Sequence, residues 1–235
     1  MRAAMFHGLN RPVTIETVVD PKPGAGQVLI KVNRCGICGS DISMTGGGPM
    51  ALPLGRFGHE YAGEVVEVGR DVERVKVGDR IAALPAAPCG ACEGCRRSGN
   101  PLFCENASYL VGGFAEYMVM PAGAAIPVRD DARLDTVCLI GCGVTTGVGA
   151  ALNTVQIVPG DGVAVIGCGG VGLSIIQGAR IAQADPSIAS DPRAEKLDRA
   201  LSLGATHAID PFHEDAAKGV RGLTAQGVHY AVEAL

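Results

Sequence analysis

The sequence contains no tryptophan, and aromatic residues make up only 4% of its 235 residues. So few aromatic rings leave little surface on which nucleic-acid bases could stack. The charge points the same way, because 24 acidic residues outnumber 20 Lys and Arg residues and give a formal net charge of −4. Nucleic-acid-binding domains are usually basic. We therefore expect no nucleic-acid partner.

Long apolar runs are also missing. No stretch approaches the roughly 20 consecutive apolar residues that a membrane-spanning helix needs, and the N-terminal segment MRAAMFHG contains no apolar signal core. We therefore expect a cytoplasmic protein with no membrane contact. A chain of 235 residues has room for one large domain or two small ones, and it can bury a core without a disulfide scaffold.

Nine cysteines are present, an odd number in a chain that we expect to lie in the reducing cytosol, so a disulfide framework is the poorer interpretation. Four of them have the spacing C-x2-C-x2-C-x8-C, with glycines between them that let the chain turn. Tetrahedral zinc takes four sulfur ligands, and such a site has no open position for chemistry. The spacing predicts a structural zinc site, and the alternative is a loop of chance cysteines. The four residues are Cys89, Cys92, Cys95 and Cys104.

A second group of potential ligands is scattered along the chain, as expected for a catalytic metal whose ligands converge only on folding. Its members are Cys35, Cys38, His59, Cys138, Cys142 and Cys168. For Cys35 and Cys38 the alternative is a redox-active CxxC pair. A single histidine is more often structural than a ligand, but His59 lies between Gly58 and the carboxylate of Glu60, which favours a ligand.

Residues 1–143 predict a β-rich domain, because short apolar runs are separated by turns that contain Gly or Pro. Several short strands of this kind favour a partly open barrel. The expected strands lie at residues 28–32, at 61–68, at the end of 75–81, and at 114–120, where Pro121 stops the last one.

Residues 144–235 predict an α/β domain, in which a continuous apolar strand at 163–166 is typical of a buried parallel sheet. Helices are expected at 144–154 and 173–184, and further strands at 205–209 and 227–235. The segment 185–190 should be a weak strand, because it holds a proline and two serines.

The segment GCGGVG at 167–172 fits the dinucleotide-binding pattern G-x-G-x-x-G, and it stands between a predicted strand and a predicted helix. Gly167, Gly169 and Gly172 would let the backbone turn and approach a pyrophosphate at the helix N-terminus. Asp191, 19 residues after Gly172, would accept hydrogen bonds from the ribose and repel a 2′-phosphate, which favours NAD over NADP. Alternatively or in addition, Asp191 is the N-cap of a helix that begins with Pro192.

These motifs, in this order, resemble the zinc-dependent alcohol dehydrogenases of the medium-chain dehydrogenase/reductase superfamily, and the resemblance covers the whole chain. It rests on CGSD at 38–41, GHE at 58–60, the four-cysteine lobe, GFAEY at 113–117, LIGCG at 139–143 and the glycine fingerprint. The resemblance implies a GroES-like barrel with a structural zinc lobe at 1–143, followed by a partial Rossmann doubly wound parallel sheet at 144–235. It also implies two zinc ions per chain, NAD as coenzyme and a small alcohol as substrate.

The resemblance also assigns site residues. Cys38, His59 and Cys142 match the catalytic zinc ligands, and Glu60 matches the acidic neighbour of that metal. Asp41 resembles the carboxylate that orients the histidine ligand, and Ser40 the hydroxyl that passes the alcohol proton to the coenzyme ribose. The residues that match coenzyme-binding positions are Thr146 and Val171 at the nicotinamide and Lys196 at the adenosine ribose. The implied chemistry is Lewis-acid oxidation of an alcohol with hydride transfer to NAD.

The sequence departs from the family pattern in several places. Ser43 stands where the proton relay often ends in a histidine, and the last spacing in the zinc lobe is x8 where x7 is usual. The chain ends at Leu235, where relatives continue, so residues 228–235 would form an uncovered apolar edge that invites aggregation. The loop around residues 44–57, which contributes to the substrate pocket in the family, does not identify the alcohol.

We therefore expect an NAD-dependent zinc alcohol or polyol dehydrogenase, which in a complete enzyme would form a dimer or tetramer. One alternative is a truncated zinc-binding remnant or subunit without turnover. A zinc-ribbon module that binds nucleic acid is disfavoured by the acidic charge and the scarcity of aromatic residues.

Overall fold

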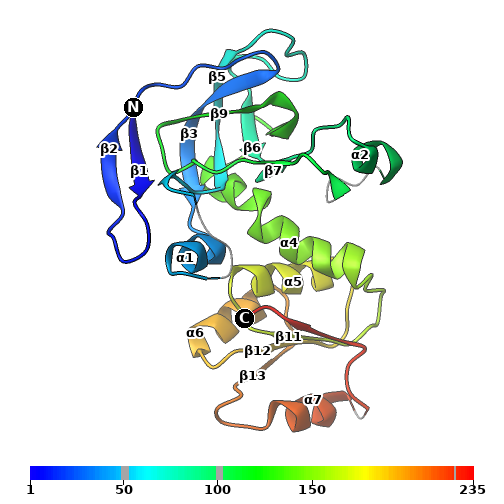
Figure 1. Cartoon of the computed structure of the whole chain (residues 1–235). Coiled ribbons are helices and arrows are strands. Elements are labelled where there is room, and N and C mark those ends of the chain that lie inside the picture. Colours follow the sequence, from blue (N-terminus) through cyan, green and yellow to red (C-terminus); the bar gives the residue numbers. More distant parts are fainter. Residues whose placement is uncertain (49–52, 99–102, 225) are drawn as a thin grey trace. The chain divides into compact units, whose positions relative to one another are not determined.

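The computed structural model describes residues 1–48, 53–98, 103–224 and 226–235 (Figure 1). The chain divides into two compact units, Met1–Cys142 and Gly143–Leu235, and each is described by itself. Part of the expected substrate loop, 49–52, and part of the four-cysteine lobe, 99–102, lie outside the described residues. Among the described helices, none is by itself long and apolar enough to cross a membrane, and only the consecutive pair Leu134–Gly141 and Gly143–Thr154 passes that test when combined.

The first unit is built mainly of short strands. Its elements are β1 (Arg2–Phe6), β2 (Thr14–Thr17), β3 (Gln27–Gly36), α1 (Gly39–Thr45), β4 (Gly55–Arg56), β5 (Glu60–Val68), β6 (Arg80–Ala83), β7 (Ala86–Ala87), α2 (Glu93–Ser98), β8 (Ser108–Tyr109), β9 (Tyr117–Pro121), η2 (Ala122–Ala124), β10 (Ala125–Pro127), α3 (Leu134–Val137) and η3 (Cys138–Gly141).

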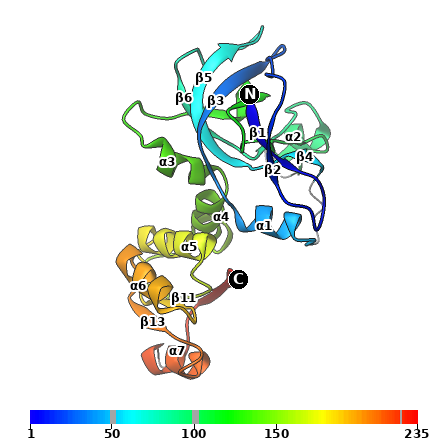
Figure 2. The same cartoon turned by 90° about the vertical axis from the view of Figure 1, so that its left-hand side faces the viewer.

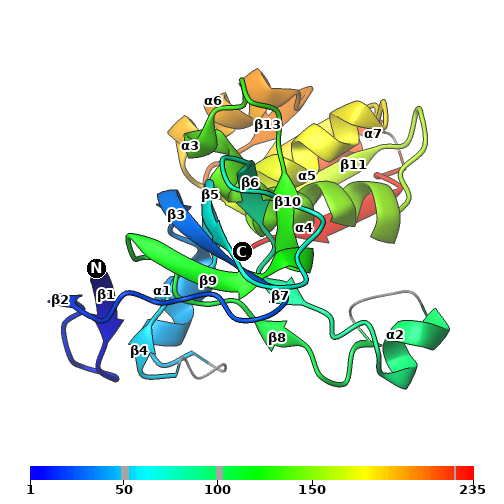
Figure 3. The ribbon, with the colours of Figure 1, turned by 90° about the horizontal axis from the view of Figure 1, so that it is seen from above.

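A curved five-stranded sheet with the order β10-β6-β5-β3-β9 is the centre of this unit, and β2-β1-β4 form a smaller sheet. Figure 2 shows the two longest strands, β3 and β5, side by side, and they pair antiparallel. The sequence alternates along them, so that Val28, Ile30 and Val65 enter the core while Lys31 and Glu64 face outward. The ribbon β7–β8 leads to the lobe that carries α2, at the outer end of this unit (Figure 3).

The second unit alternates strands and helices. Its elements are α4 (Gly143–Gly149), the π-helical turn η4 (Ala150–Thr154), β11 (Val163–Ile166), α5 (Gly170–Ile181), β12 (Ser187–Ser190), α6 (Ala194–Leu203), β13 (His207–Ile209), α7 (Ala216–Thr224) and β14 (Tyr230–Glu233). The described strands form a parallel sheet with the order β13-β12-β11-β14.

Helices cover both faces of this parallel sheet. Val163 and Val165 of β11 pack with residues of α5 and α6 on one face, whereas Ala164, between them, packs on the opposite face in the cluster that includes α7 (Figure 1). The alternation follows from the period of two in a strand. The β-rich first unit and the doubly covered parallel sheet of the second unit agree with the expected fold class.

Several expected element boundaries are wrong. β9 begins at Tyr117 rather than at 114, and Pro121 is its last residue because proline is tolerated at the edge of a sheet. α5 begins inside the glycine fingerprint, at Gly170, and ends at Ile181 rather than at 184. β13 and β14 are each shorter than expected.

The expected weakness of the second strand is also wrong. All four residues of β12 are buried, and the strand pairs with β11 on one side and β13 on the other. Ile188 packs in the core, and the small side chains of Ser187, Ala189 and Ser190 suit a strand that is enclosed by two neighbouring strands and by helices on both faces. The fourth strand, β14, is at the edge of the described sheet.

Candidate metal and coenzyme sites

The first potential ligand stands at the start of α1. Cys38 is the N-cap residue of this helix, with extended backbone angles, and its backbone N–H donates to Oδ2 of Asp41 at 2.9 Å. Asp41 is the third residue of the helix, the position from which an acidic side chain reaches back to the N-cap. The CGSD motif therefore begins the helix and places a carboxylate beside Cys38.

His59 and Glu60 stand where β5 begins, and Cys142 follows η3. Two glycines shape their surroundings. A Cβ at Gly36 would come within 2.6 Å of Oε2 of Glu60, and a Cβ at Gly141 would come within 2.2 Å of the carbonyl oxygen of Ala83. At Gly141 the near atom is backbone, so only glycine fits there, whereas at Gly36 a larger residue would have to displace the side chain of Glu60. The sequence motifs include Gly141 in LIGCG but assign no role to either glycine.

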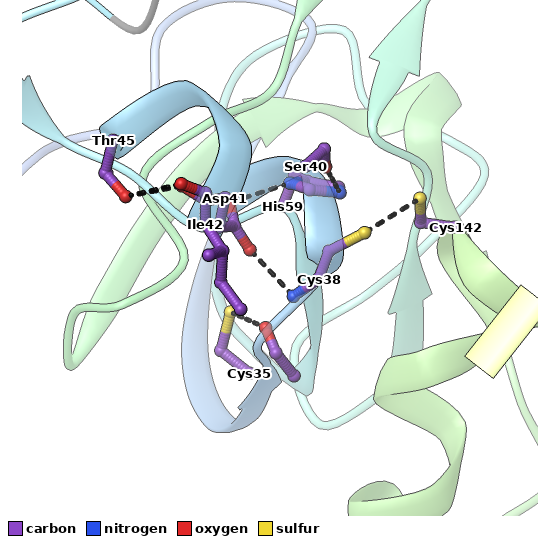
Figure 4. Close-up of polar contacts among 9 residues, drawn as sticks. Cys35, Cys38, Ser40, Asp41, Ile42, Thr45, His59 and Cys142 are labelled. Carbon is purple, nitrogen blue, oxygen red and sulfur yellow. Dashed lines mark hydrogen bonds and ion pairs between the residues drawn. The ribbon is translucent and has the colours of Figure 1, made fainter. Parts of the chain in front are cut away.

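These residues form one cluster. The sulfur atoms of Cys38 and Cys142, a ring nitrogen of His59 and a carboxylate oxygen of Glu60 all lie within 4.8 Å of one another. Sγ of Cys38 and Sγ of Cys142 are 3.9 Å apart (Figure 4). Two sulfurs bound at 2.3 Å to one tetrahedral zinc would be about 3.8 Å apart. The donor types and the sulfur spacing therefore fit a zinc ion.

The hydrogen bonds of His59 define its orientation. Oδ1 of the buried Asp41 accepts from Nδ1 at 3.1 Å, so the other nitrogen, Nε2, is on the side of Ser40, whose Oγ is 3.4 Å away (Figure 4). The hydrogen bonds to Asp41 and to Cys142 raise the pKa of His59 to about 11 despite its burial. This environment favours positive charge at the cluster, which either a proton or a metal cation can supply.

The remaining cysteines of the scattered group do not join this cluster. Burial raises the pKa of Cys35 to about 12 and that of Cys168 to about 11, and it also raises the pKa of Cys138. These three thiols are therefore protonated at neutral pH. The sulfur of Cys38 lies beside Cys142, and both Cys35 and Cys38 are free thiols, which argues against the CxxC pair as a disulfide.

The four lobe cysteines form a second cluster, in which all four sulfurs lie within 4.8 Å of one another. Backbone N–H groups of the knuckle point at these sulfurs: Cys89 N–H donates to Cys104 at 3.2 Å, and Cys92 N–H donates to Cys89 at 3.4 Å. A Cβ at Gly94 would lie 1.8 Å from the carbonyl oxygen of Phe103, so the lobe closes only with glycine there.

The opposite pKa shifts of two lobe cysteines are consistent with a bound cation. Hydrogen bonds from the backbone N–H groups of Cys95 and Glu105 lower the pKa of Cys92 to about 6. Desolvation and the neighbouring sulfurs raise the pKa of Cys95 to about 12. One thiolate therefore suppresses the ionisation of the next, and a soft divalent ion would remove that conflict. Four sulfurs would fill its coordination sphere.

In the second unit, the glycine fingerprint joins β11 to α5. Gly167 has φ +93°, a conformation that favours glycine, and a Cβ at Gly172 would come within 1.8 Å of the carbonyl oxygen of Gly167. Gly169 is the N-cap of α5, and no atom lies within 4 Å of the Cβ it would carry. The loop is therefore tight beneath the helix and open at Gly169, where a phosphate could approach the helix N-terminus.

Asp191 follows β12, and its side chain is only 3% exposed. Its Oδ2 accepts from Cys168 N–H at 2.9 Å, and its Oδ1 accepts from Arg193 N–H at 3.0 Å. Burial raises the pKa of Asp191, but these hydrogen bonds and Lys196, with Nζ 3.4 Å from Oδ2, outweigh burial and lower it. The alternative role as N-cap is wrong, because Arg193 is the N-cap of α6 and Pro192 precedes the helix.

Three other predicted residues lie on helices, and two of these helices, α4 and α5, pack against each other. Thr146 is exposed on α4, and Val171 is half-buried in the first turn of α5, within the same unit. Ser43 is exposed on α1 in the first unit.

Comparison with known proteins agrees with the geometry. Residues 24–130 match the family described as "Alcohol dehydrogenase GroES-like domain", and residues 170–235 match "Zinc-binding dehydrogenase". An S-(hydroxymethyl)glutathione dehydrogenase from Escherichia coli O157:H7 is 38% identical over 91% of this chain. The match spans 65% of that relative's length, so the chain covers slightly less than two thirds of it.

Solved structures are also similar to this chain. An alcohol dehydrogenase from Thermus sp. ATN1 aligns with a TM-score of 0.90 and 31% identity, over 100% of this chain and 70% of that one. A candidate zinc-binding dehydrogenase from Sinorhizobium meliloti 1021, bound to NADP, aligns with a TM-score of 0.89 and 30% identity, over 99% of this chain and 69% of that one.

Proposed function

The chain belongs to the zinc-dependent alcohol dehydrogenases of the medium-chain dehydrogenase/reductase superfamily, and from that premise we propose that it transfers a hydride between an alcohol or polyol and NAD. The observation that carries the proposal is the cluster of Cys38, His59 and Cys142, with Glu60 beside it. Two sulfurs and one imidazole provide three ligands, and a catalytic zinc keeps its fourth position for substrate or water.

In this proposal Cys38, His59 and Cys142 hold the catalytic zinc. Zinc bound there would supply Lewis acidity, which makes an alcohol hydroxyl easier to deprotonate. Asp41 accepts from Nδ1 of His59 and so keeps Nε2 available to the metal. The same carboxylate accepts from the backbone of Cys38, so one side chain positions two ligands.

Ser40 is proposed to accept the alcohol proton and pass it toward the coenzyme ribose. Its hydroxyl is beside Nε2 of His59, next to the proposed metal position. Ser43 has no ring nitrogen with which to receive the proton, and it is exposed on α1. We propose that the proton leaves to solvent without a histidine at that position.

The lobe of Cys89, Cys92, Cys95 and Cys104 is proposed to hold a second zinc ion with a structural role. Four sulfur ligands leave that metal no position for substrate, so its contribution is to the stability of the lobe.

The second unit is proposed to bind NAD. Gly167, Gly169 and Gly172 shape the turn at the pyrophosphate, and the N-terminus of α5 favours its negative charge. Asp191 and Lys196 would face the adenosine ribose, because Oδ1 of Asp191, which accepts from Arg193 N–H, has a second lone pair for a ribose hydroxyl. Thr146 and Val171 are proposed to contact the nicotinamide.

The names of relatives suggest substrates to test. Relatives are named S-(hydroxymethyl)glutathione dehydrogenase, alcohol dehydrogenase and benzyl alcohol dehydrogenase. We propose a small-molecule alcohol as the substrate class, assembly into a homodimer or homotetramer, and a cytoplasmic location. The alternative is a zinc-binding protein of the same family without turnover.

Metal analysis and turnover separate these two functions. We expect two zinc ions per chain, and reduction of NAD with at least one member of a panel of primary, secondary, aromatic and polyol alcohols and the glutathione–formaldehyde adduct. The variants Cys38→Ser and His59→Ala should abolish turnover but retain NAD binding. Cys35→Ser is the matched control, because it removes a nearby thiol that does not belong to the cluster. Two zinc ions and bound NAD without turnover on any alcohol would favour the alternative.

A further inference from the structure

The start of α6 carries a group of charges beside Asp191 whose arrangement bears on which coenzyme binds. The inference rests on the proposed binding of NAD in the second unit. Asp191 is the residue expected to exclude the 2′-phosphate of NADP, whereas an arginine close to that position commonly accommodates it. Arg193 is two residues away, and its own backbone N–H donates to Oδ1 of Asp191.

The guanidinium of Arg193 is held by an ion pair. Its Nη2 is 2.5 Å from Oε1 of Glu195, and the two side chains are 64% and 63% exposed. Glu195 is ionised at neutral pH, since its ordinary pKa is 4.5 and hydrogen bonds from its own backbone N–H and from Arg193 lower that pKa. Arg193 therefore lies within reach of solvent and of a ligand, but its charge is compensated.

The other cation of this group is also compensated. Nζ of Lys196 is 3.4 Å from Oδ2 of Asp191, so each of the two cations has one carboxylate partner. A 2′-phosphate would meet a group whose formal charges sum to zero, and it would have to break an ion pair to gain a cation. Removal of the Glu195 charge alone would leave Arg193 free and the group positively charged.

We propose that two carboxylates select the coenzyme, and that Glu195 is a specificity-determining residue because it withholds Arg193 from a 2′-phosphate. Asp191 acts at the ribose hydroxyls, and Glu195 acts on the cation that NADP would need. A candidate zinc-binding dehydrogenase of 30% identity holds NADP in its structure, so a relative with the same fold accepts the phosphorylated coenzyme.

The test compares two nucleotides that differ only in the 2′-phosphate, adenosine 5′-monophosphate and adenosine 2′,5′-bisphosphate. Their dissociation constants for the full chain are measured by calorimetry at low ionic strength. We expect Glu195→Gln to lower the dissociation constant of the bisphosphate roughly three- to fivefold, which is the effect of one exposed ion pair. The dissociation constant of the monophosphate should change by less than about twofold. The gain should shrink as salt screens the exposed charges.

Two further variants make the result specific. Asp198→Asn removes the same charge from the exposed surface of α6, three residues further along, and should not tighten the bisphosphate. Arg193→Met in the Glu195→Gln background should abolish the gain, because Arg193 is the cation that provides it.

The inference is overturned if Glu195→Gln has no selective effect, if Asp198→Asn gives an equal gain, or if the gain survives Arg193→Met. A different result would contradict the proposed function: neither nucleotide would bind the unmodified chain. That result would also contradict the inference, which rests on coenzyme binding. Because binding is measured without an alcohol, a lack of turnover does not affect the outcome.

Discussion

Asp41 provides the sharpest test of how the metal cluster is held. Its carboxylate is 2% exposed and accepts two hydrogen bonds, one from Cys38 N–H at 2.9 Å and one from Nδ1 of His59 at 3.1 Å. Both donors belong to proposed zinc ligands. The substitution Asp41→Asn keeps the shape of the side chain but replaces one acceptor oxygen with an NH2 donor.

Whichever way the amide turns, one of the two contacts becomes donor against donor. If the amide oxygen faces His59, the NH2 group meets the backbone N–H of Cys38, and if it turns over, the conflict moves to the imidazole. A buried hydrogen-bond donor without an acceptor costs about 1–3 kcal/mol of stability. The substitution also removes the charge-assisted hydrogen bond between the carboxylate and the imidazole of His59. Variants of residues that support metal ligands typically lose 10–100-fold in metal affinity, which is about 1.4–2.8 kcal/mol.

We therefore expect Asp41→Asn to lower the zinc affinity of the Cys38–His59–Cys142 cluster 10–100-fold. The zinc affinity of the four-cysteine lobe should not change. Chelator competition with a fluorescent zinc indicator measures the two affinities. Asp79→Asn is the matched control, because Asp79 also accepts from a backbone N–H and a side chain, both of Lys76, in an exposed turn. Unchanged affinity at the cluster, or equal loss in Asp79→Asn, would refute the reasoning.

Three further predictions follow from contacts in the two units. Cys92→Ser should reduce the zinc content by one equivalent and lower the melting temperature without removing metal from the other cluster, and elemental analysis with calorimetry checks both. Ser187→Ala should raise the free energy of unfolding by about 1 kcal/mol in urea titrations, because the buried Oγ of Ser187 has no hydrogen-bond partner in the described structure; a lower stability would contradict this. The pKa of Asp191 in the folded chain is below its ordinary value of 3.8. The ionised carboxylate therefore stabilises the fold fully above pH 3.8, and this contribution is lost as the pH falls through the lower pKa of the folded state. The stability difference between the unmodified chain and Asp191→Asn should therefore shrink below about pH 4, and a difference that stays constant into acid would count against this assignment.

The sequence was most informative where the chemistry is local. CGSD places Asp41 close to the predicted ligand Cys38, and GHE places Glu60 next to the predicted ligand His59. In the lobe, three cysteines at intervals of three residues form a knuckle whose backbone N–H groups point at the sulfur atoms. Convergence of Cys142 with these segments could be predicted only from the family resemblance, since 104 residues separate it from Cys38.

The sequence was least informative where distant contacts decide. Three of the four residues of β12 are serine or alanine, which have little intrinsic preference for a strand, yet pairing with β11 and β13 makes this segment a strand. Asp191 followed by proline is typical of a helix start, but its carboxylate instead bonds to Cys168, 23 residues earlier. Neither contact has a signal within a short window of sequence.

Gly36 shows how far the cluster extends beyond its ligands. This residue has no functional group, and it is on β3, outside the metal-binding motifs. One methyl group there would press on Oε2 of Glu60 at 2.6 Å and on Leu139 at 2.7 Å, close to the segment that leads to Cys142. A search for catalytic residues by chemical type would pass over Gly36, although any side chain there would have to displace the carboxylate of Glu60 and the side chain of Leu139.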